Sequence, residues 1–250
     1  MSKRYQNLEY YAQKFRSDNA LSDNEPLKLK SLLQKNNIFT VYRPLSSGFS
    51  GMSFKIIVKE KCRRFMLINC EHSIGKQHFT ICHELYHLYF QSDFNSEISC
   101  AGKFDKNGNP EEFNADMFAS YLLLPRMGLW EMIPENEKNK NKISLPTLVS
   151  IEHYYACSRS ALLNRLHQMD LIDENLKQNY SVDIKSNALK LGFSTDLYEK
   201  GNRNFFIGDY GTLAFKAWEE GMVSESSYLS LLEDLGIDIS RISEQDSVDE

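Results

Sequence analysis

The stretch His83-Glu84-Leu85-Tyr86-His87 decides how the rest of this chain is interpreted, because it fits the HExxH pattern. Residues four apart on an α-helix lie on one face, so both imidazoles can reach a single metal ion. Glu84 lies on the adjoining edge of that face and can reach a water molecule at the metal without being a ligand itself. Short motifs also arise by chance, so the flanking segments have to support this one. Here the motif falls in a helix expected over residues 76–90, directly after a strand.

A second helix is expected to supply the remaining ligand. Residues 110–124 have a well-marked helix start, with Asn109 able to cap and Pro110 suited to the first position. Catalytic zinc takes three protein ligands and keeps one position open, and Glu112 is the candidate for the third. Asp116 lies one turn further on the same face, where it can accept a hydrogen bond from a ligand imidazole. The predicted zinc ligands are therefore His83, His87 and Glu112.

Composition narrows the classes of protein to be considered. The chain has 250 residues, of which 42% are hydrophobic and 25% charged, as in an ordinary globular protein. Its net charge of −5 argues against nucleic-acid binding through a basic surface that extends over the whole chain. The amino terminus has no apolar signal core, and no run of about eighteen apolar residues occurs. Five cysteines without a CxxC pair indicate reduced thiols, so we expect a cytoplasmic protein with no membrane segment.

Hydrophobic periodicity divides the chain into elements. Helices are expected over residues 5–18, 27–35, 76–90, 110–124, 185–191, 209–220 and 224–235, and a helix–turn–helix pattern over 145–170. Strands are expected over residues 38–42, 52–58 and 65–69. The remaining segments are interpreted as a charged hairpin connection at 59–64, a polar loop at 92–109, a solvated linker at 135–142 and a disordered acidic tail at 244–250.

Several blocks of the sequence resemble the ImmA/IrrE family of zinc metallopeptidases. They are residues 77–88 around the HExxH motif, residues 112–125 of the second helix, residues 158–166, and the approach to the first strands at 44–52. The sequence departs from the family at Cys82 and Tyr86, where many members have Ala and Gly. Neither departure removes a ligand, although Tyr86 is bulky and changes the expected shape of the site.

The resemblance implies an α+β fold with a zincin-like, thermolysin-like core. Such a core has a small antiparallel or mixed sheet and active-site helices. We expect it over residues 1–143, followed by a helix–turn–helix-like segment over 144–180 and a small helical region over 181–250.

The resemblance also implies a function. The chain is expected to be a zinc-dependent endopeptidase that hydrolyses one protein partner, a helix–turn–helix transcriptional repressor, and thereby switches gene expression in a stress response, a mobile element or phage defence. Glu84 is the expected general base for peptide hydrolysis. The sequence does not single out an oxyanion-stabilising group, and the candidates are His153, Tyr154 and Arg159.

Two other classes of function stay open at this point. The segment 145–171 has the form of a DNA-reading module, but its second helix carries only Arg159 and Arg165 as cations, so DNA binding is not expected and partner binding is favoured. Alternatively the zinc site is not catalytic, with a fourth ligand from Cys70, Cys82 or Cys100. Small buried or loop thiols are the simpler interpretation of these cysteines.

Overall fold

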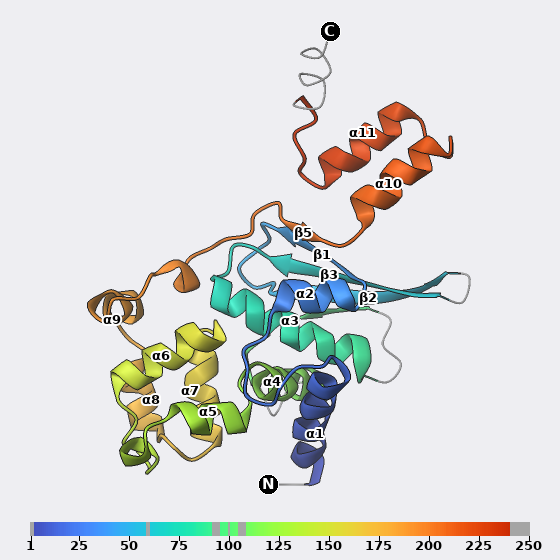
Figure 1. Ribbon diagram of the computed structural model, residues 1–250. Helices are drawn as coiled ribbons and strands as arrows, with labels where there is room; N and C mark the ends of the chain where they lie inside the picture. The colour runs from blue at the N-terminus through green and yellow to red at the C-terminus, as the bar shows by residue number, and fades with distance from the viewer. Residues whose placement is uncertain (1–2, 59–60, 92–95, 100, 105–108, 241–250) are drawn as a thin grey trace.

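The computed structural model describes residues 3–58, 61–91, 96–99, 101–104 and 109–240, and one five-stranded sheet lies at its centre (Figure 1). The strand order is β4-β2-β3-β1-β5. β1 runs parallel to β3, whereas the other neighbouring pairs are antiparallel. The expected small mixed sheet and the α+β class are therefore confirmed. The strands are β1 (Ile38–Arg43), β2 (Gly51–Val58), β3 (Lys61–Asn69), β4 (Ser96–Ser99) and β5 (Phe206–Ile207).

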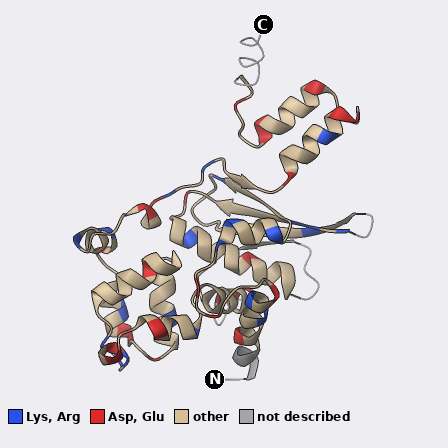
Figure 2. Ribbon diagram, in the orientation of Figure 1, with Lys and Arg blue, Asp and Glu red and all other residues tan. Residues whose placement is uncertain are grey.

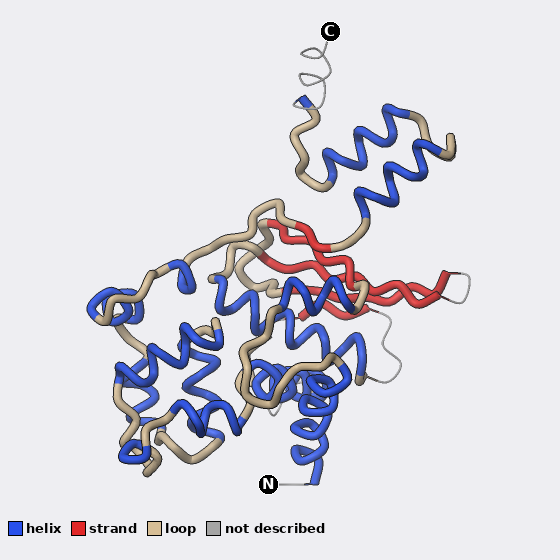
Figure 3. The backbone as a smooth tube through the Cα atoms, viewed as in Figure 1, coloured by secondary structure: helices blue, strands red, loops and turns tan. Residues whose placement is uncertain are grey.

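Helices build layers on one face of this sheet. α3 (Ile74–Tyr89) packs against β2 and β3, α4 (Pro110–Leu123) packs against α3, and α1 (Lys3–Asp18) packs against α4. Figure 3 shows this stack and, beyond the opposite side of the sheet, the hairpin of α10 and α11. The remaining helices are α2 (Leu29–Lys35), α5 (Arg126–Met132), α6 (Leu145–Tyr155), α7 (Arg159–Gln168), α8 (Glu174–Tyr180), α9 (Ile184–Lys190), α10 (Tyr210–Glu219) and α11 (Glu225–Asp234).

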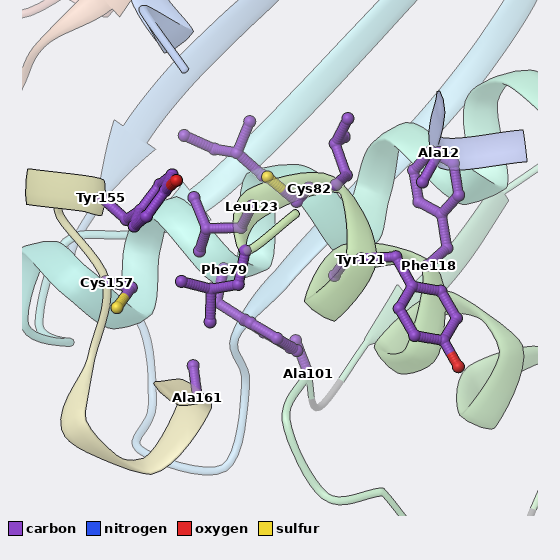
Figure 4. Close-up of a cluster of buried hydrophobic side chains, with 14 of the residues drawn as sticks. Ala12, Phe79, Cys82, Ala101, Phe118, Tyr121, Leu123, Tyr155, Cys157 and Ala161 are labelled. Carbon is purple, nitrogen blue, oxygen red and sulfur yellow. The ribbon is translucent and has the colours of Figure 1, made fainter. Parts of the chain in front are cut away.

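The two helices of the HExxH region meet along a face of small side chains. Ala115 and Ala119 of α4 are fully buried, as the expected close approach to α3 requires. The start of α4 is also as expected, with the Asn109 side chain accepting a hydrogen bond from the Glu111 amide at 2.9 Å. Buried leucines at the end of α4 and aromatic rings such as Phe118 fill the space below α3 (Figure 4). Each such side chain contributes about 1.5–3 kcal/mol on burial.

Two consecutive helices, α6 and α7, lie where the helix–turn–helix pattern was expected. Ser144 and Ser158 cap the two helices, and Ala156 between them adopts a left-handed conformation with φ of 50°. The apolar positions Leu148, Ile151, Leu162 and Leu166 are fully buried, so the anticipated packing is found. The turn lies close against α3, because a Cβ at Gly75 would come within 2.6 Å of the Ser158 nitrogen.

Five segments differ from the expectations. Residues 61–64 were expected to be a connection, but they belong to β3 and pair with β2. The side chains at 61–63 are exposed, so their charges stay in water and do not oppose strand formation. The polar loop at 92–109 contains the edge strand β4, which exists through its pairing with β2. The region after residue 180 is not wholly helical, since β5 joins the sheet beside β1. α5 and α8 also lie where no helix was expected.

Some expectations lie outside the described residues, namely those for Cys100 and for the acidic tail at 244–250. No helix in the described part of the chain is long and apolar enough to cross a membrane.

Candidate metal centre

Three side chains from α3 and α4 converge on one point. The Nε2 atoms of His83 and His87 lie 3.0 Å apart. Glu112 places Oε2 3.3 Å from His83 Nε2 and Oε1 3.2 Å from His87 Nε2. Ligands at about 2.0–2.1 Å from a tetrahedral zinc ion stand about 3.3 Å from one another. The two imidazole nitrogens and the two carboxylate oxygens therefore lie at distances typical of ligands of one zinc ion, and this group could hold a metal ion.

The hydrogen bonds behind the imidazoles direct both Nε2 atoms toward Glu112. His83 Nδ1 lies 2.8 Å from Asp116 Oδ1, and His87 Nδ1 contacts Gln91 Oε1. When each Nδ1 donates its hydrogen, each Nε2 presents a lone pair to the other and to the carboxylate. Moreover, Glu112 Oε1 is buried and makes no hydrogen bond within the described residues. A cation between these groups removes the mutual repulsion and satisfies the buried oxygen, so the residues fit a bound metal.

The electrostatics of the centre also favour positive charge. Burial lowers the pKa of His83, but the nearby carboxylates of Asp116 and Glu112 outweigh burial and raise the pKa to about 10. Burial raises the pKa of Glu112, but its close contacts with the imidazoles of His83 and His87 outweigh burial and lower the pKa to about 2. Glu112 is therefore an anion at neutral pH, as a metal ligand of this type must be.

Asp116 does more than orient His83. Its Oδ1 also accepts a hydrogen bond from the Gly102 amide, and its Oδ2 accepts one from the Phe104 amide, both at 2.7 Å. The carboxylate thus ties the segment 101–104 to the metal centre. The bond to a ligand imidazole was expected from helical spacing. The backbone bonds were not, because nothing local in the sequence relates residues 101–104 to Asp116.

Glu84 is fully buried between α3 and β2 and does not belong to the ligand group. Its Oε2 accepts a hydrogen bond from Ser53 Oγ of β2 at 2.7 Å. Gly51 leaves the adjacent space, since a Cβ there would lie 3.3 Å from Glu84 Oε1 and 2.7 Å from a methyl group of Thr80. Sequence reasoning missed Gly51 and Ser53. The available signal was their alternation on one face of β2, where small residues mark a close approach.

Tyr86, where the sequence departs from the ImmA/IrrE pattern, lies in the contact between α3 and α4. Its hydroxyl donates a hydrogen bond to Glu111 Oε2 at 2.8 Å, and its ring packs near Phe90 and Phe118. Only 5% of its surface is exposed. The bulky ring therefore braces the first turn of α4, directly beside Glu112.

The three oxyanion candidates contact residues of α6, of α8 and of the segment after α9. Arg159 is buried and paired with Glu152, and it donates to the Tyr180 carbonyl at 2.8 Å. The His153 ring stacks on Phe193. Tyr154 is 46% exposed and contacts Tyr155. Within the described residues, no contact joins these candidates to His83, His87 or Glu112.

No cysteine belongs to the ligand group in the described part of the chain. Cys70, Cys82 and Cys157 are buried free thiols. Burial raises the pKa of Cys82 to about 12, so this neighbour of His83 stays a neutral thiol at physiological pH.

An α+β domain that brings two helical histidines and a glutamate to one point has the form of a metallopeptidase. Comparison with protein families agrees: the Peptidase_M78 family, described as the IrrE N-terminal-like domain, matches residues 34–167. The chain belongs to this family, and membership implies a metallopeptidase with a protein substrate. The match covers the sheet up to β4, the ligand helices and the α6–α7 pair, and it ends inside α7. No curated protein that was compared matches the chain.

Proposed function

We propose that this chain is a zinc-dependent endopeptidase whose ligands are His83, His87 and Glu112. The observation that carries the proposal is the convergence of two imidazole nitrogens and one carboxylate at the spacing of tetrahedral zinc. Two histidines and one acid leave a coordination position for water or substrate, which distinguishes catalytic from structural zinc sites. The arrangement of the sheet, the HExxH helix and the Glu112 helix supports a zincin-like, thermolysin-like core.

Each neighbouring group has a role in this proposal. His83, His87 and Glu112 would hold the zinc ion, which would supply Lewis acidity for lowering the pKa of a bound water and polarising the scissile carbonyl. Glu84 takes the proton of the attacking water and delivers it to the leaving amine. Ser53 holds the Glu84 carboxylate by a hydrogen bond, so that it stays close to the ligands. Asp116 keeps His83 in the tautomer that presents Nε2 to the metal.

An extended substrate strand is proposed to lie along β4. β4 is at one edge of the sheet, and the strand hydrogen-bonded to it, β2, carries Ser53, which contacts Glu84. An edge strand offers backbone donors and acceptors to an added strand, which would align a peptide bond along the metal centre. The substrate is proposed to be a helix–turn–helix transcriptional repressor, so that cleavage switches gene expression. The resemblance to ImmA/IrrE peptidases supports this substrate.

The arginines of α7 argue against the alternative of a DNA-binding regulator. Arg159 and Arg165 are the arginines of α7, all of whose residues are described, and both are almost completely buried. Arg165 donates to the Leu124 carbonyl and stacks on Tyr121. Neither guanidinium is placed to meet a phosphate, so we propose a structural or partner-binding role for α6 and α7.

Co-expression with a helix–turn–helix repressor encoded beside this gene tests the function. We expect one specific repressor fragment, absent when Glu84→Gln replaces the wild-type chain. Purified zinc-loaded protein should digest casein poorly. Rapid, unselective digestion of casein would contradict the proposed restriction to one partner, and a repressor left intact by a zinc-loaded chain would contradict the proposed substrate.

A further inference from the structure

A cavity of about 310 Å³ lies beside the metal centre, toward the start of α3. Four segments enclose it: residues 47–50 before β2, the first turns of α3, residues 101–104, and the first turn of α7. Its volume is enough for a large side chain together with ordered water. The ligands themselves do not line it, so its chemistry is separate from metal binding.

Three of these walls are connected directly to groups of the metal centre. Phe79 of α3 precedes His83 by one helical turn. Residues 101–104 are held by Asp116, which also contacts His83. Ser50 precedes Gly51, whose missing side chain leaves room for Glu84. A peptide whose scissile bond lies at the metal would therefore place a neighbouring side chain at this cavity.

The lining combines apolar walls with positive charge. Phe79 and Phe104 pack with ring centroids 5.7 Å apart, and Figure 4 shows Phe79, Ala101 and Ala161 within one buried cluster. The polar residues of the lining are serines, including Ser158 and Ser160, and the two lysines Lys76 and Lys103. Among the described residues, no acidic residue lines the cavity. Such a surface suits a side chain with an apolar stem and an anionic end.

We propose that this cavity is a specificity subsite that selects a glutamate side chain of the substrate next to the scissile bond. The glutamate methylenes pack on Phe79 and Phe104. Its carboxylate pairs with Lys76 and Lys103 and accepts hydrogen bonds from Ser158 and Ser160. This inference rests on the proposed function, because it takes the metal centre as the place of cleavage. Lys76 and Lys103 are thus specificity residues, and neither touches the metal.

Binding of peptide hydroxamates to the full-length, zinc-loaded chain tests the subsite without relying on turnover. The probes carry a zinc-binding hydroxamate next to Glu, Gln or Leu and are otherwise identical. We expect the Glu probe to bind about tenfold more tightly than the Gln probe, as a charge-assisted hydrogen bond to lysine implies. The Leu probe should bind less tightly than the Glu probe, because its side chain makes no charge-assisted contact with Lys76 or Lys103.

Substitutions then assign the preference to the cavity. Lys76→Gln and Lys103→Gln should each reduce the Glu preference severalfold and leave binding of the Gln probe unchanged. Lys190→Gln, which removes a charge from exposed α9, is the matched control and should keep the full preference. Melting temperatures show that each variant is folded, and the exposed position of Lys103 makes that variant the safer of the two.

The outcomes separate the subsite from the metal centre. Equal binding of the Glu and Gln probes, or tighter binding of the Leu probe, would overturn the glutamate subsite while leaving the zinc centre intact. Failure of every hydroxamate to bind to metal-loaded protein would instead overturn the zinc centre and the proposed function. An undiminished Glu preference in both Lys76→Gln and Lys103→Gln would also overturn the subsite.

Discussion

Glu84 and Glu112 are acids of the same kind on facing helices, and their surroundings give them different roles. Glu84→Gln keeps the size of the side chain and removes the base, so zinc should stay bound while cleavage falls about 100- to 10,000-fold. Glu112→Gln exchanges an anionic ligand for a neutral one, so zinc affinity should fall together with activity. Zinc content by elemental analysis, measured beside cleavage, separates the two. The roles are wrong if Glu84→Gln loses zinc as readily as Glu112→Gln.

Asp116 contacts a ligand imidazole and two backbone amides. Asp116→Asn keeps its shape but removes its charge and one acceptor, so zinc affinity should fall about 10- to 100-fold, as for other groups behind a metal ligand. Competition with a chromogenic chelator measures the affinity. The exposed Asp183→Asn is the control and should bind zinc like the wild type. Unchanged zinc affinity in Asp116→Asn would show that the bond to His83 does not hold the ligand.

Removal of the metal should destabilise the whole chain. If zinc occupies the proposed centre, it binds the folded state and not the unfolded chain, so zinc-loaded protein should melt at a higher temperature than protein treated with a chelator. In His83→Ala the melting temperature should be nearly the same with and without zinc, because one ligand is missing. Differential scanning calorimetry provides the comparison. An equal response of wild type and His83→Ala would place the bound zinc elsewhere.

The residues of the metal centre differ in how far local sequence determines them. His83, His87 and Glu84 follow from helical spacing, and Glu112 and Asp116 follow from their position on one face of a capped helix. Ser53 and Gly51 reach Glu84 only because β2 packs on α3. The amides of Gly102 and Phe104 reach Asp116 only because a loop folds back. The contacts to Glu84 and Asp116 from distant segments depend on tertiary structure, so no local sequence pattern predicts them.

At the scale of elements, Gly75 fixes how α3 meets the α6–α7 turn. A Cβ at this position would lie 2.6 Å from Ser158 N and 2.8 Å from the Cys157 carbonyl carbon, both backbone atoms. Gly75→Ala should therefore destabilise the fold by about 1–3 kcal/mol through overpacking. Gly211→Ala in α10 meets nothing within 4 Å and should stabilise slightly, by about 0.5–1 kcal/mol. Urea unfolding of the two variants is the test, and a Gly75→Ala chain as stable as wild type would contradict it.

The buried pair of Arg159 and Glu152 joins α7 to α6. Arg159→Ala leaves the Glu152 carboxylate buried without its cation, so stability should fall by about 3–5 kcal/mol. Arg126→Ala removes an exposed arginine and serves as control, with little expected change. Chemical denaturation measures both variants. A stable Arg159→Ala chain that binds zinc but no longer cleaves would instead assign Arg159 to the reaction.

Helices were more accessible to sequence reasoning than strands. Asn109 and Pro110 mark the start of α4, and its apolar residues predict that it is buried. Periodic leucines predict α6 and α7. β4 (Ser96–Ser99) has no apolar alternation and depends on hydrogen bonds to β2. β5 spans only two residues and depends on β1, which is far away in the sequence. Edge strands of this kind are products of pairing, so their own residues do not predict them.

At the scale of the molecule, negative charge is concentrated at the carboxy-terminal end. Residues 209–240 contain seven acidic residues and one lysine, although the whole chain has a net charge of only −5 (Figure 2). This part consists mainly of the α10–α11 hairpin, in which Phe215, Trp218 and Tyr228 form an aromatic cluster. The hairpin meets the sheet at few points, such as the stacked rings of Phe39 and Tyr210. The layered core is thus largely complete without it.

The preceding segment is different, because residues 181–208 are built into the core. β5 pairs with β1, and the Ile207 side chain is almost completely buried. Gln77 of α3 donates to the Gly201 carbonyl and accepts from Asn202, and Tyr198 donates to Glu152. We therefore propose that the core extends to residue 208 and that the carboxy-terminal unit with the α10–α11 hairpin begins after it. The sequence by itself predicts this boundary at 180/181.

Two truncations test this boundary. A chain of residues 1–208 keeps β5 and the bonds to Gln77, so it should fold, bind zinc and melt within a few degrees of the full chain, as the loss of about 1 kcal/mol implies. A chain of residues 1–180 exposes the edge of β1 and loses the buried Ile207, which alone contributes about 1.5–3 kcal/mol. It should melt at a clearly lower temperature or aggregate. Equal melting temperatures for the two truncations would restore the boundary at 180/181, and loss of zinc from residues 1–208 would make the acidic hairpin part of the core.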